Sequence, residues 1–198
     1  MKRILIIPSW FKDSKSPSAG TFFEEEARLM SRVYNISLFI MERYWADEGI
    51  DLEIPFIRKE DKGLFEFIVS FPQWHDKSIE ENLKIQCSYA EKALTAILKQ
   101  YDAAWDLVHA YATFPAGCIG KRFSEILHIP YVITEHFGPF CPDFAHSMLV
   151  KEAMKDALEK ANAVLCVSSH LRQQILMQNI NQQHFLYYFV FVFHTLFH

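Results

Sequence analysis

The sequence predicts an α/β domain built on a doubly wound parallel sheet of the Rossmann-like kind. Short continuous apolar runs, typical of strands buried on both faces of a parallel sheet, alternate with amphipathic stretches of helical length. This alternation indicates βαβ units with right-handed crossovers. The 198 residues suit one domain, and 51% hydrophobic with 22% charged residues is a globular composition.

The first strand is expected at residues 4–7, an apolar run that Pro8 ends. A loop of turn-forming residues then leads to Gly20, which opens a helix with an acidic first turn, as helix starts often have. The remaining elements are expected, in chain order, as strand 36–40, weaker strand candidates 54–57 and 64–71, helix 79–98, strand 106–110, helix 115–127, strand 131–134, helix 148–161, strand 164–167, and a helix to about residue 177 capped by Ser168 or Ser169.

Charge and cysteine usage exclude several classes of function. A formal net charge of -4 argues against a nucleic-acid-binding face, which would need to be basic. The apolar run at residues 4–7 is too short for a signal peptide, whose apolar region spans about 7 to 15 residues, so the cytoplasm is the expected location. Cys87, Cys118, Cys141 and Cys166 form no CxxC pair, so we expect reduced thiols rather than a zinc or redox site.

The ligand crevice of such a sheet lies beyond the carboxyl ends of its strands. Gly20 and Thr21 follow the loop after the first strand, and the free N–H groups of a helix start attract phosphate. The stretch is no GxGxxG motif, and a single glycine that opens a helix more often serves chain geometry than phosphate binding.

Two histidines lie at expected strand ends, His109 within one strand and His136 just after the next. A ligand contact and a structural hydrogen bond remain equal interpretations for both. Glu135 would orient His136 or form an ion pair, and Ser168 is a helix cap first and a ligand contact second. The other histidines show no metal-ligand spacing, and the acidic run 24–26 is expected to be a solvated helix face.

Five segments carry a resemblance to a known family. They are ILIIPSW at 4–10, PSAGTFF at 17–23, DLVHAY at 106–111, PYVITEH at 130–136 and ANAVLCVS at 161–168. In order and spacing, from Met1 to about Asn181, they resemble the N-terminal domain of glycosyltransferase family four. The resemblance implies half of a GT-B fold, in which two Rossmann-like domains face each other, the first holding the acceptor and the second the nucleotide sugar.

The resemblance also implies retaining hexosyl transfer with no metal ion or other cofactor. The partners would be a nucleotide-sugar donor and a saccharide or lipid-linked acceptor, with peripheral membrane association in the lipid-linked case and no nucleic acid. Gly20 and Thr21 would lie at the donor diphosphate, and His136 would be the catalytic residue at the donor sugar. The residues implied to line the cleft are His109, Tyr111, Glu135 and Ser168. Family members often have His-x-His where this chain has His-Ala-Tyr, so the match does not carry a role for Tyr111.

Residues 182–198 depart from the resemblance. In the family, the donor domain, with a basic pair and paired glutamates, would follow at this point. This chain instead has an apolar stretch, which is shorter than the roughly 20 residues that span a membrane. We expect residues 1–181 to form the acceptor-side domain and 182–198 to be an aberrant tail of a truncated chain, inactive alone. Two alternatives stay open: a non-catalytic sugar- or partner-binding module, and another GT-B enzyme such as a sugar-nucleotide epimerase.

Overall fold

A computed structural model of the chain describes residues 1–12, 16, 18–45, 56–61, 64–140, 147–178, 180 and 185–187. The strands are β1 (Arg3–Pro8), β2 (Asn35–Trp45), β3 (Phe56–Asp61), β4 (Leu64–Gln73), β5 (Leu107–Tyr111), β6 (Tyr131–Glu135), β7 (Ala163–Cys166) and β8 (Phe185–Tyr187). The helices are α1 (Thr21–Met30), α2 (Ile79–Gln100), the π-type turn η1 (Thr113–Gly117), α3 (Cys118–Leu127), α4 (Met148–Lys160) and α5 (Ser169–Leu176).

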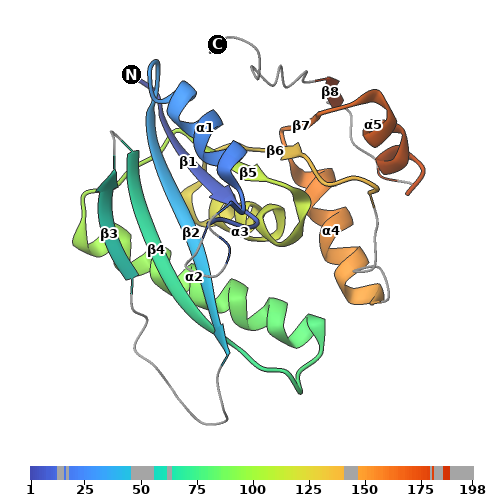
Figure 1. Cartoon of the computed structure of the whole chain (residues 1–198), viewed down its shortest axis with the longest axis horizontal. Helices are drawn as coiled ribbons and strands as arrows, with labels where there is room; N and C mark the ends of the chain where they lie inside the picture. Colours follow the sequence, from blue (N-terminus) through green and yellow to red (C-terminus); the bar gives the residue numbers. More distant parts are fainter. Residues whose placement is uncertain are drawn as a thin grey trace.

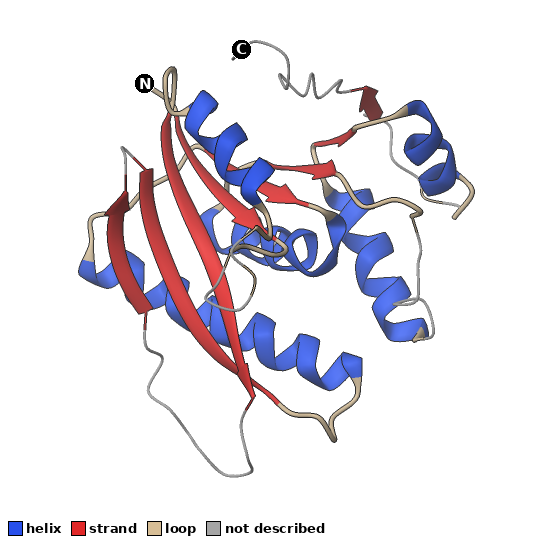
Figure 2. Ribbon diagram, in the orientation of Figure 1, coloured by secondary structure: helices blue, strands red, loops and turns tan. Residues whose placement is uncertain are grey.

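The strands form one sheet in the order β3-β4-β2-β1-β5-β6-β7-β8, with helices on both faces (Figures 1 and 2). Every neighbouring pair is parallel except β3 with β4, so the predicted doubly wound parallel sheet is confirmed and gains one antiparallel edge strand. The weak candidate at 54–57 overlaps β3, which runs on to Asp61; residues 54 and 55 lie outside the described part. An edge strand tolerates the charged stretch that hid it in the sequence.

Each face of the sheet has its own core. On one face, Ile4 and Ile6 of β1 pack with Phe23 and Ala27 of α1. On the other face, the alternate β1 residues Leu5 and Ile7 join the cluster formed with α2, α3, α4 and α5. Full burial of one such side chain contributes about 1.5–3 kcal/mol. The continuous apolar run at the start of the chain therefore reflects a strand covered on both sides.

The helix starts follow their sequence signals with one exception. Ser168 caps α5 by accepting the N–H of Leu171 at 3.1 Å, as predicted, and Ser78 caps α2 in a capping box with Glu81. The helix expected from residue 115 begins at Cys118 instead. Phe114 has an extended backbone, a conformation that a following proline favours, so the chain makes η1 before the regular helix.

The sheet continues into the segment that was expected to lie outside the domain. β8 pairs in parallel with β7, with Leu186 beside Leu165. The proposed boundary at residue 181 stays a prediction, since most of 182–198 lies outside the described residues. Among the described helices, none combines the length and the apolar character that crossing a membrane requires.

Candidate functional site

The sheet has its topological switch point at β1, which pairs with β2 on one side and with β5 on the other. Ligands of open α/β sheets bind outside the carboxyl ends of the strands at such a point. The loops that leave β1 and β5 are tied together there. The N–H of Ser9 donates to the carbonyl of Tyr111 at 3.1 Å, and the hydroxyl of Ser9 accepts the N–H of Ala116 at 3.1 Å. The border of the crevice is therefore held by hydrogen bonds between distant parts of the chain.

Gly20 is the N-cap of α1 and has a left-handed backbone, with φ 67°. A Cβ at this position would lie 2.7 Å from the carbonyl oxygen of Trp10. Chain geometry alone therefore requires glycine here, whatever binds nearby. The first helical bonds run from the N–H groups of Phe23 and Glu24 to the Gly20 carbonyl, which leaves the N–H groups of Thr21 and Phe22 outside the helical pattern.

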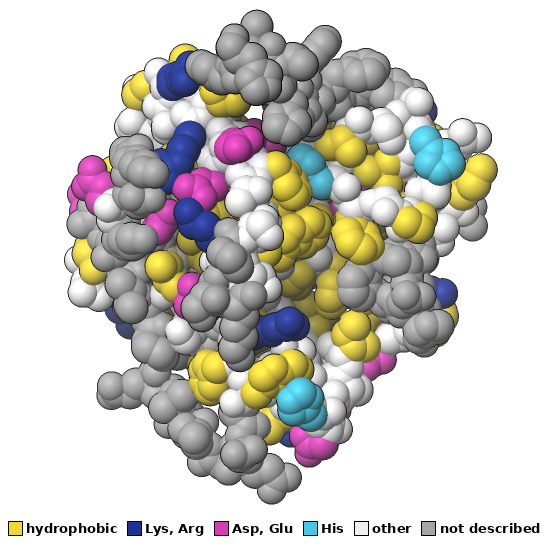
Figure 3. Space-filling view, in the orientation of Figure 1, with side chains coloured by type: hydrophobic (Ala, Val, Ile, Leu, Met, Phe, Trp, Pro, Cys, Tyr) yellow, Lys and Arg dark blue, Asp and Glu magenta, His cyan; other side chains and the backbone are white. Residues whose placement is uncertain are grey.

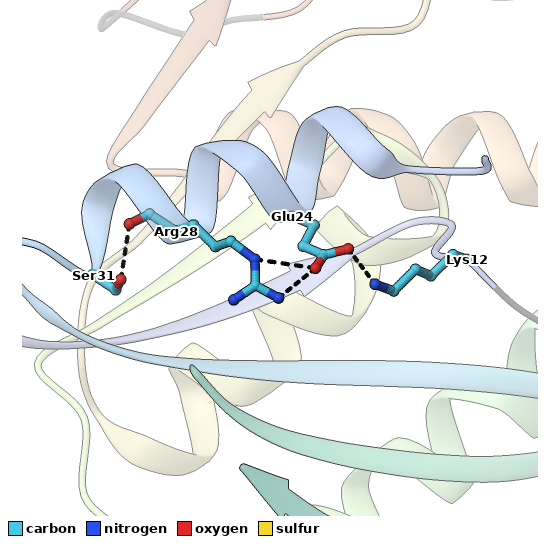
Figure 4. A network of polar contacts seen from close by, with 4 residues as sticks. All are labelled: Lys12, Glu24, Arg28 and Ser31. Atoms are coloured by element: carbon cyan, nitrogen blue, oxygen red, sulfur yellow. Dashed lines mark hydrogen bonds and ion pairs between the residues drawn. The ribbon is translucent and has the colours of Figure 1, made fainter. Parts of the chain in front are cut away.

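An ion-pair network fixes α1 against the loop after β1 (Figure 4). The Glu24 carboxylate lies 2.5 Å from Lys12 Nζ and 2.5 Å from a guanidinium nitrogen of Arg28. Burial raises the pKa of Glu24, but the hydrogen bonds from Lys12 and Arg28 outweigh it, and the pKa is lowered overall. These ion pairs thus hold Lys12, just after β1, against the first turn of α1.

His136 follows β6 and packs against α1 rather than standing free in the crevice. Its side chain is 7% exposed. The ring centroid lies 5.3 Å from that of Phe22, 5.1 Å from Phe23 and 5.7 Å from Tyr111. Burial lowers the pKa of the imidazole to about 4, so it is uncharged at neutral pH. The structure therefore places His136 beside the first turn of α1.

Glu26 is the residue that the sequence reasoning missed. The run 24–26 was expected to be a solvated face, and this is wrong for Glu24 and Glu26, whose side chains are 12% and 14% exposed; the Glu26 carboxylate lies 4.0 Å from Nε2 of His136. Burial raises the pKa of this carboxyl to about 7, despite a hydrogen bond from Tyr111. Helical spacing could have indicated its burial, since Glu26 is three residues after the buried Phe23 and four before Met30, on the side of the helix that packs on the sheet.

His109 and Tyr111 do not line an open cleft in this structure, which corrects the expectation. Tyr111 is fully buried and stacks on Phe23 with centroids 4.9 Å apart. His109 is 6% exposed, and its Nε2 lies 2.7 Å from the hydroxyl of Thr134. Burial, with His136 nearby, lowers the pKa of His109 to about 3. Both side chains face the α1 side of the sheet because they alternate with the core residues of β5.

Glu135 and Ser168 have structural partners. The carboxylate of Glu135, 1% exposed, accepts hydrogen bonds from Thr113 and from the N–H of Phe137. It therefore orders the loops after β5 and β6, and no hydrogen bond to the His136 ring is recorded within the described chain. Burial raises its pKa, although these hydrogen bonds oppose the change. Ser168 is exposed and its hydroxyl is occupied as the cap of α5.

Two hollows adjoin this arrangement. A cavity of about 180 Å³ lies between the loops after β1, β5 and β6, with Glu135 and Phe137 in its wall. A larger cleft of about 400 Å³ lies on the other side of Trp10 and reaches the ends of β2 and β4. Its lining combines aromatic, amide and charged side chains, among them Trp10, Phe71, Gln73, Gln86, Glu42 and Arg43. Figure 3 shows apolar side chains gathered in the hollowed centre of this face.

The described residues include no group of three or more His, Cys, Asp or Glu side chains that could hold a metal ion. Three of the four cysteines, Cys87, Cys118 and Cys166, are free and buried; Cys141 lies outside the described residues. Burial raises the pKa of all three thiols, to about 11 for Cys87, which makes them poor nucleophiles.

Comparisons with known proteins point in one direction. The sequence profile described as Glycosyltransferase Family 4 matches residues 41–184. An uncharacterized glycosyltransferase of Methanocaldococcus jannaschii is 30% identical over 70 residues, which are 35% of this chain and 20% of that protein. The chain thus spans about a fifth of the length of this relative.

Solved structures share the fold. The trehalose-6-phosphate structure from E. coli bound with UDP-2-fluoro glucose is similar over 88% of this chain and 42% of its own, with a TM-score of 0.53 and 8% identity. UGT73P12 of Glycyrrhiza uralensis, complexed with glycyrrhetinic acid 3-O-monoglucuronide, is similar over 92% of this chain and 48% of its own, with a TM-score of 0.51 and 9% identity. The OtsA apo structure gives a TM-score of 0.56 at 9% identity, over 88% of this chain and 42% of its own. Each similarity covers less than half of the solved chain, which agrees with one half of a GT-B fold.

Proposed function

Because the chain belongs to glycosyltransferase family 4, we propose that it is the acceptor-side domain of a retaining GT-B glycosyltransferase. The reaction is the transfer of a hexosyl group from a nucleotide sugar to a saccharide or lipid-linked acceptor. The observation that carries the proposal is the meeting of His136 with the start of α1, 5.3 Å from ring to ring at Phe22, beside the switch point of the sheet. A lipid-linked acceptor would add peripheral contact with a membrane.

The start of α1 suits the donor diphosphate. The N–H groups of Thr21 and Phe22 lie at the positive end of the helix dipole, where an anion is stabilised. In the proposed reaction they face charge that develops on the leaving diphosphate as the sugar becomes oxocarbenium-like. His136, uncharged and nearby, contacts the donor sugar.

The cleft of about 400 Å³ suits a saccharide acceptor. Aromatic rings such as Trp10 and Phe71 cover the apolar faces of sugar rings, and amides such as Gln73 and Gln86 pair with hydroxyl groups. Trp10 lines this cleft and also contacts Phe22 and Phe23 at the start of α1. An acceptor bound there lies next to the proposed donor position.

Turnover requires a second domain to face this one. The 198 residues span 42% of the E. coli structure and 48% of the plant structure. Holding the donor and the acceptor in the reactive geometry lowers the activation free energy by about 7–11 kcal/mol. One domain, which forms only half of the cleft, cannot hold both reactants in this way. We therefore expect no transfer from these 198 residues by themselves.

The test is a chimera in which the donor domain of a family relative follows residue 181. We expect acceptor-dependent nucleotide release and a glycoside product with the anomeric configuration retained. His136→Ala should lower turnover about a hundredfold to a thousandfold, the loss of one preorganised polar contact. His75→Ala, an exposed residue stacked on Trp45, is the control. Release of free sugar or an epimer instead of a glycoside, or equal loss in both variants, would contradict the proposal.

A further inference from the structure

Glu26 of α1 and His136 after β6 face each other where the helix packs on the sheet. Oε2 of Glu26 lies 4.0 Å from Nε2 of His136, and the side chains are 14% and 7% exposed. This Nε2 atom is buried and has no hydrogen-bond partner among the described residues. Buried polar atoms are nearly always hydrogen-bonded, because a buried atom without a partner has lost the hydrogen bond that it would make to water in the unfolded chain. The Glu26 carboxyl is the polar group placed to supply the missing partner.

The surroundings hold both groups close to a bonding position. The hydroxyl of Tyr111 hydrogen-bonds to the Glu26 carboxyl, and the same hydroxyl lies 3.7 Å from the sulfur of Met30. The His136 ring is confined by Phe22 and Phe23, whose centroids are 5.3 and 5.1 Å away. Shortening the contact to an ordinary hydrogen bond of about 2.9 Å takes a movement of about 1 Å, which side-chain rotation supplies.

We propose that Glu26 is a positioning residue for His136: its carboxyl group selects the tautomer and the orientation of the imidazole that meets the donor sugar. With the carboxylate as acceptor, Nε2 carries the proton and Nδ1 keeps its lone pair. A fixed acceptor at Nδ1 can pair with a sugar hydroxyl group without first changing its protonation. The role at the sugar rests on the proposed function, whereas the pairing of Glu26 with His136 does not.

The protonation states around the pair favour control by the carboxyl. Burial lowers the pKa of His136 to about 4 and raises that of Glu26 to about 7. The other titratable groups that face the pair are Tyr111 and His109 of β5. Burial and the nearby His136 lower the pKa of His109 to about 3, so its imidazole is uncharged near pH 7. Protonating Glu26 turns it from an acceptor into a donor, which favours the tautomer with the proton on Nδ1. The imidazole thus remains neutral while its tautomer follows the carboxyl.

The test is ¹⁵N NMR of the imidazole nitrogens in the 198-residue chain, with His136→Gln identifying the His136 signals. At pH 8 we expect the Nε2-protonated tautomer to dominate in the wild type and a severalfold shift in the tautomer ratio in Glu26→Met, which keeps the length of the side chain and removes its polar atoms. A ratio unchanged by Glu26→Met would overturn the proposal.

A second variant keeps the test decisive if Glu26→Met does not fold. Glu26→Gln can still hydrogen-bond but cannot titrate, so the change in the His136 signals near pH 7 should disappear; its persistence would overturn the proposal. Glu25→Gln is the control, because Glu25 is exposed on the same helix. No readout here involves sugar transfer. A chimera that fails to transfer while the tautomer follows Glu26 would therefore count against the proposed function alone.

Discussion

The carboxylate of Glu135 accepts two hydrogen bonds from Thr113, one from the backbone N–H at 2.7 Å and one from the hydroxyl at 2.5 Å. Its other oxygen accepts the N–H of Phe137 at 2.8 Å. Glu135 ends β6, whereas Thr113 follows β5, so a single buried side chain fixes two of the loops that border the crevice.

Glu135→Gln should lower the free energy of unfolding by about 1–3 kcal/mol, since the amide nitrogen would face N–H donors and leave a buried group unsatisfied. Urea denaturation measures the loss. Glu125→Gln is the control, because Glu125 is exposed and its ion pair with Lys121, at 3.5 Å, contributes at most about 1 kcal/mol. Equal losses in the two variants would mean that the loop contacts of Glu135 contribute nothing of their own.

The buried imidazole of His136 should make stability fall on acidification. Its pKa is lowered to about 4 in the folded chain, against about 6.5 when unfolded. Between pH 6.5 and pH 4 the imidazole is protonated in the unfolded chain but stays neutral in the folded chain. The contribution of His136 to the free energy of unfolding is therefore fully present above pH 6.5 and is lost as the pH falls towards 4.

Between pH 7.5 and pH 5 the wild type should therefore lose about 2 kcal/mol more than His136→Gln does. Glu26 acts in the opposite direction, because its pKa is raised to about 7, and it does so in both proteins. Denaturation curves at the two pH values give the comparison, with His75→Gln as the control. If the wild type and His136→Gln lost the same free energy of unfolding between the two pH values, the lowered pKa of His136 would be refuted.

Gly20→Ala should destabilise the domain by about 1–3 kcal/mol, because the residue must keep a left-handed backbone while its Cβ meets the Trp10 carbonyl at 2.7 Å. Gly138→Ala is the matched control: its Cβ would meet nothing within 4 Å. Thermal unfolding compares them. Should Gly20→Ala melt like the wild type, glycine is not required by geometry, and a role in ligand approach becomes the stronger explanation for it.

Deleting residues 182–198 should leave a folded and more soluble domain. The only described strand removed is β8, three residues long with Leu186 53% exposed, so few buried contacts are lost. The sequence removed holds an uncharged aromatic and β-branched stretch from 185 to 197, which is typical of an aggregation-prone strand. Deleting only 188–198 is the control that keeps β8. A melting temperature much lower in the longer deletion would place β8 in the cooperative core.

The sequence pattern predicted the layers of the fold well and the inward-facing details poorly. Ile4 to Ile7 could be assigned because a strand covered on both faces is apolar throughout. Periodicity could not place Glu26 in contact with His136, because that contact depends on how α1 crosses the sheet. It also could not distinguish a crevice histidine from one like His109, which is held by Thr134 on the neighbouring strand.

The pairing at the switch point also bears on how the domain folds. β1 and β5 are adjacent in the sheet, yet Arg3 and Asp106, which are hydrogen-bonded beside them, are 103 positions apart in the chain. Contacts between such distant residues form late, because a long loop must close before they contribute. During synthesis at about 5–20 residues per second, β1, α1 and β2 can associate several seconds before β5 emerges. Among the strand pairs of the described residues, β1 with β5 joins the most distant parts of the chain, so this border of the crevice can form only after the roughly 100 residues between them have been made.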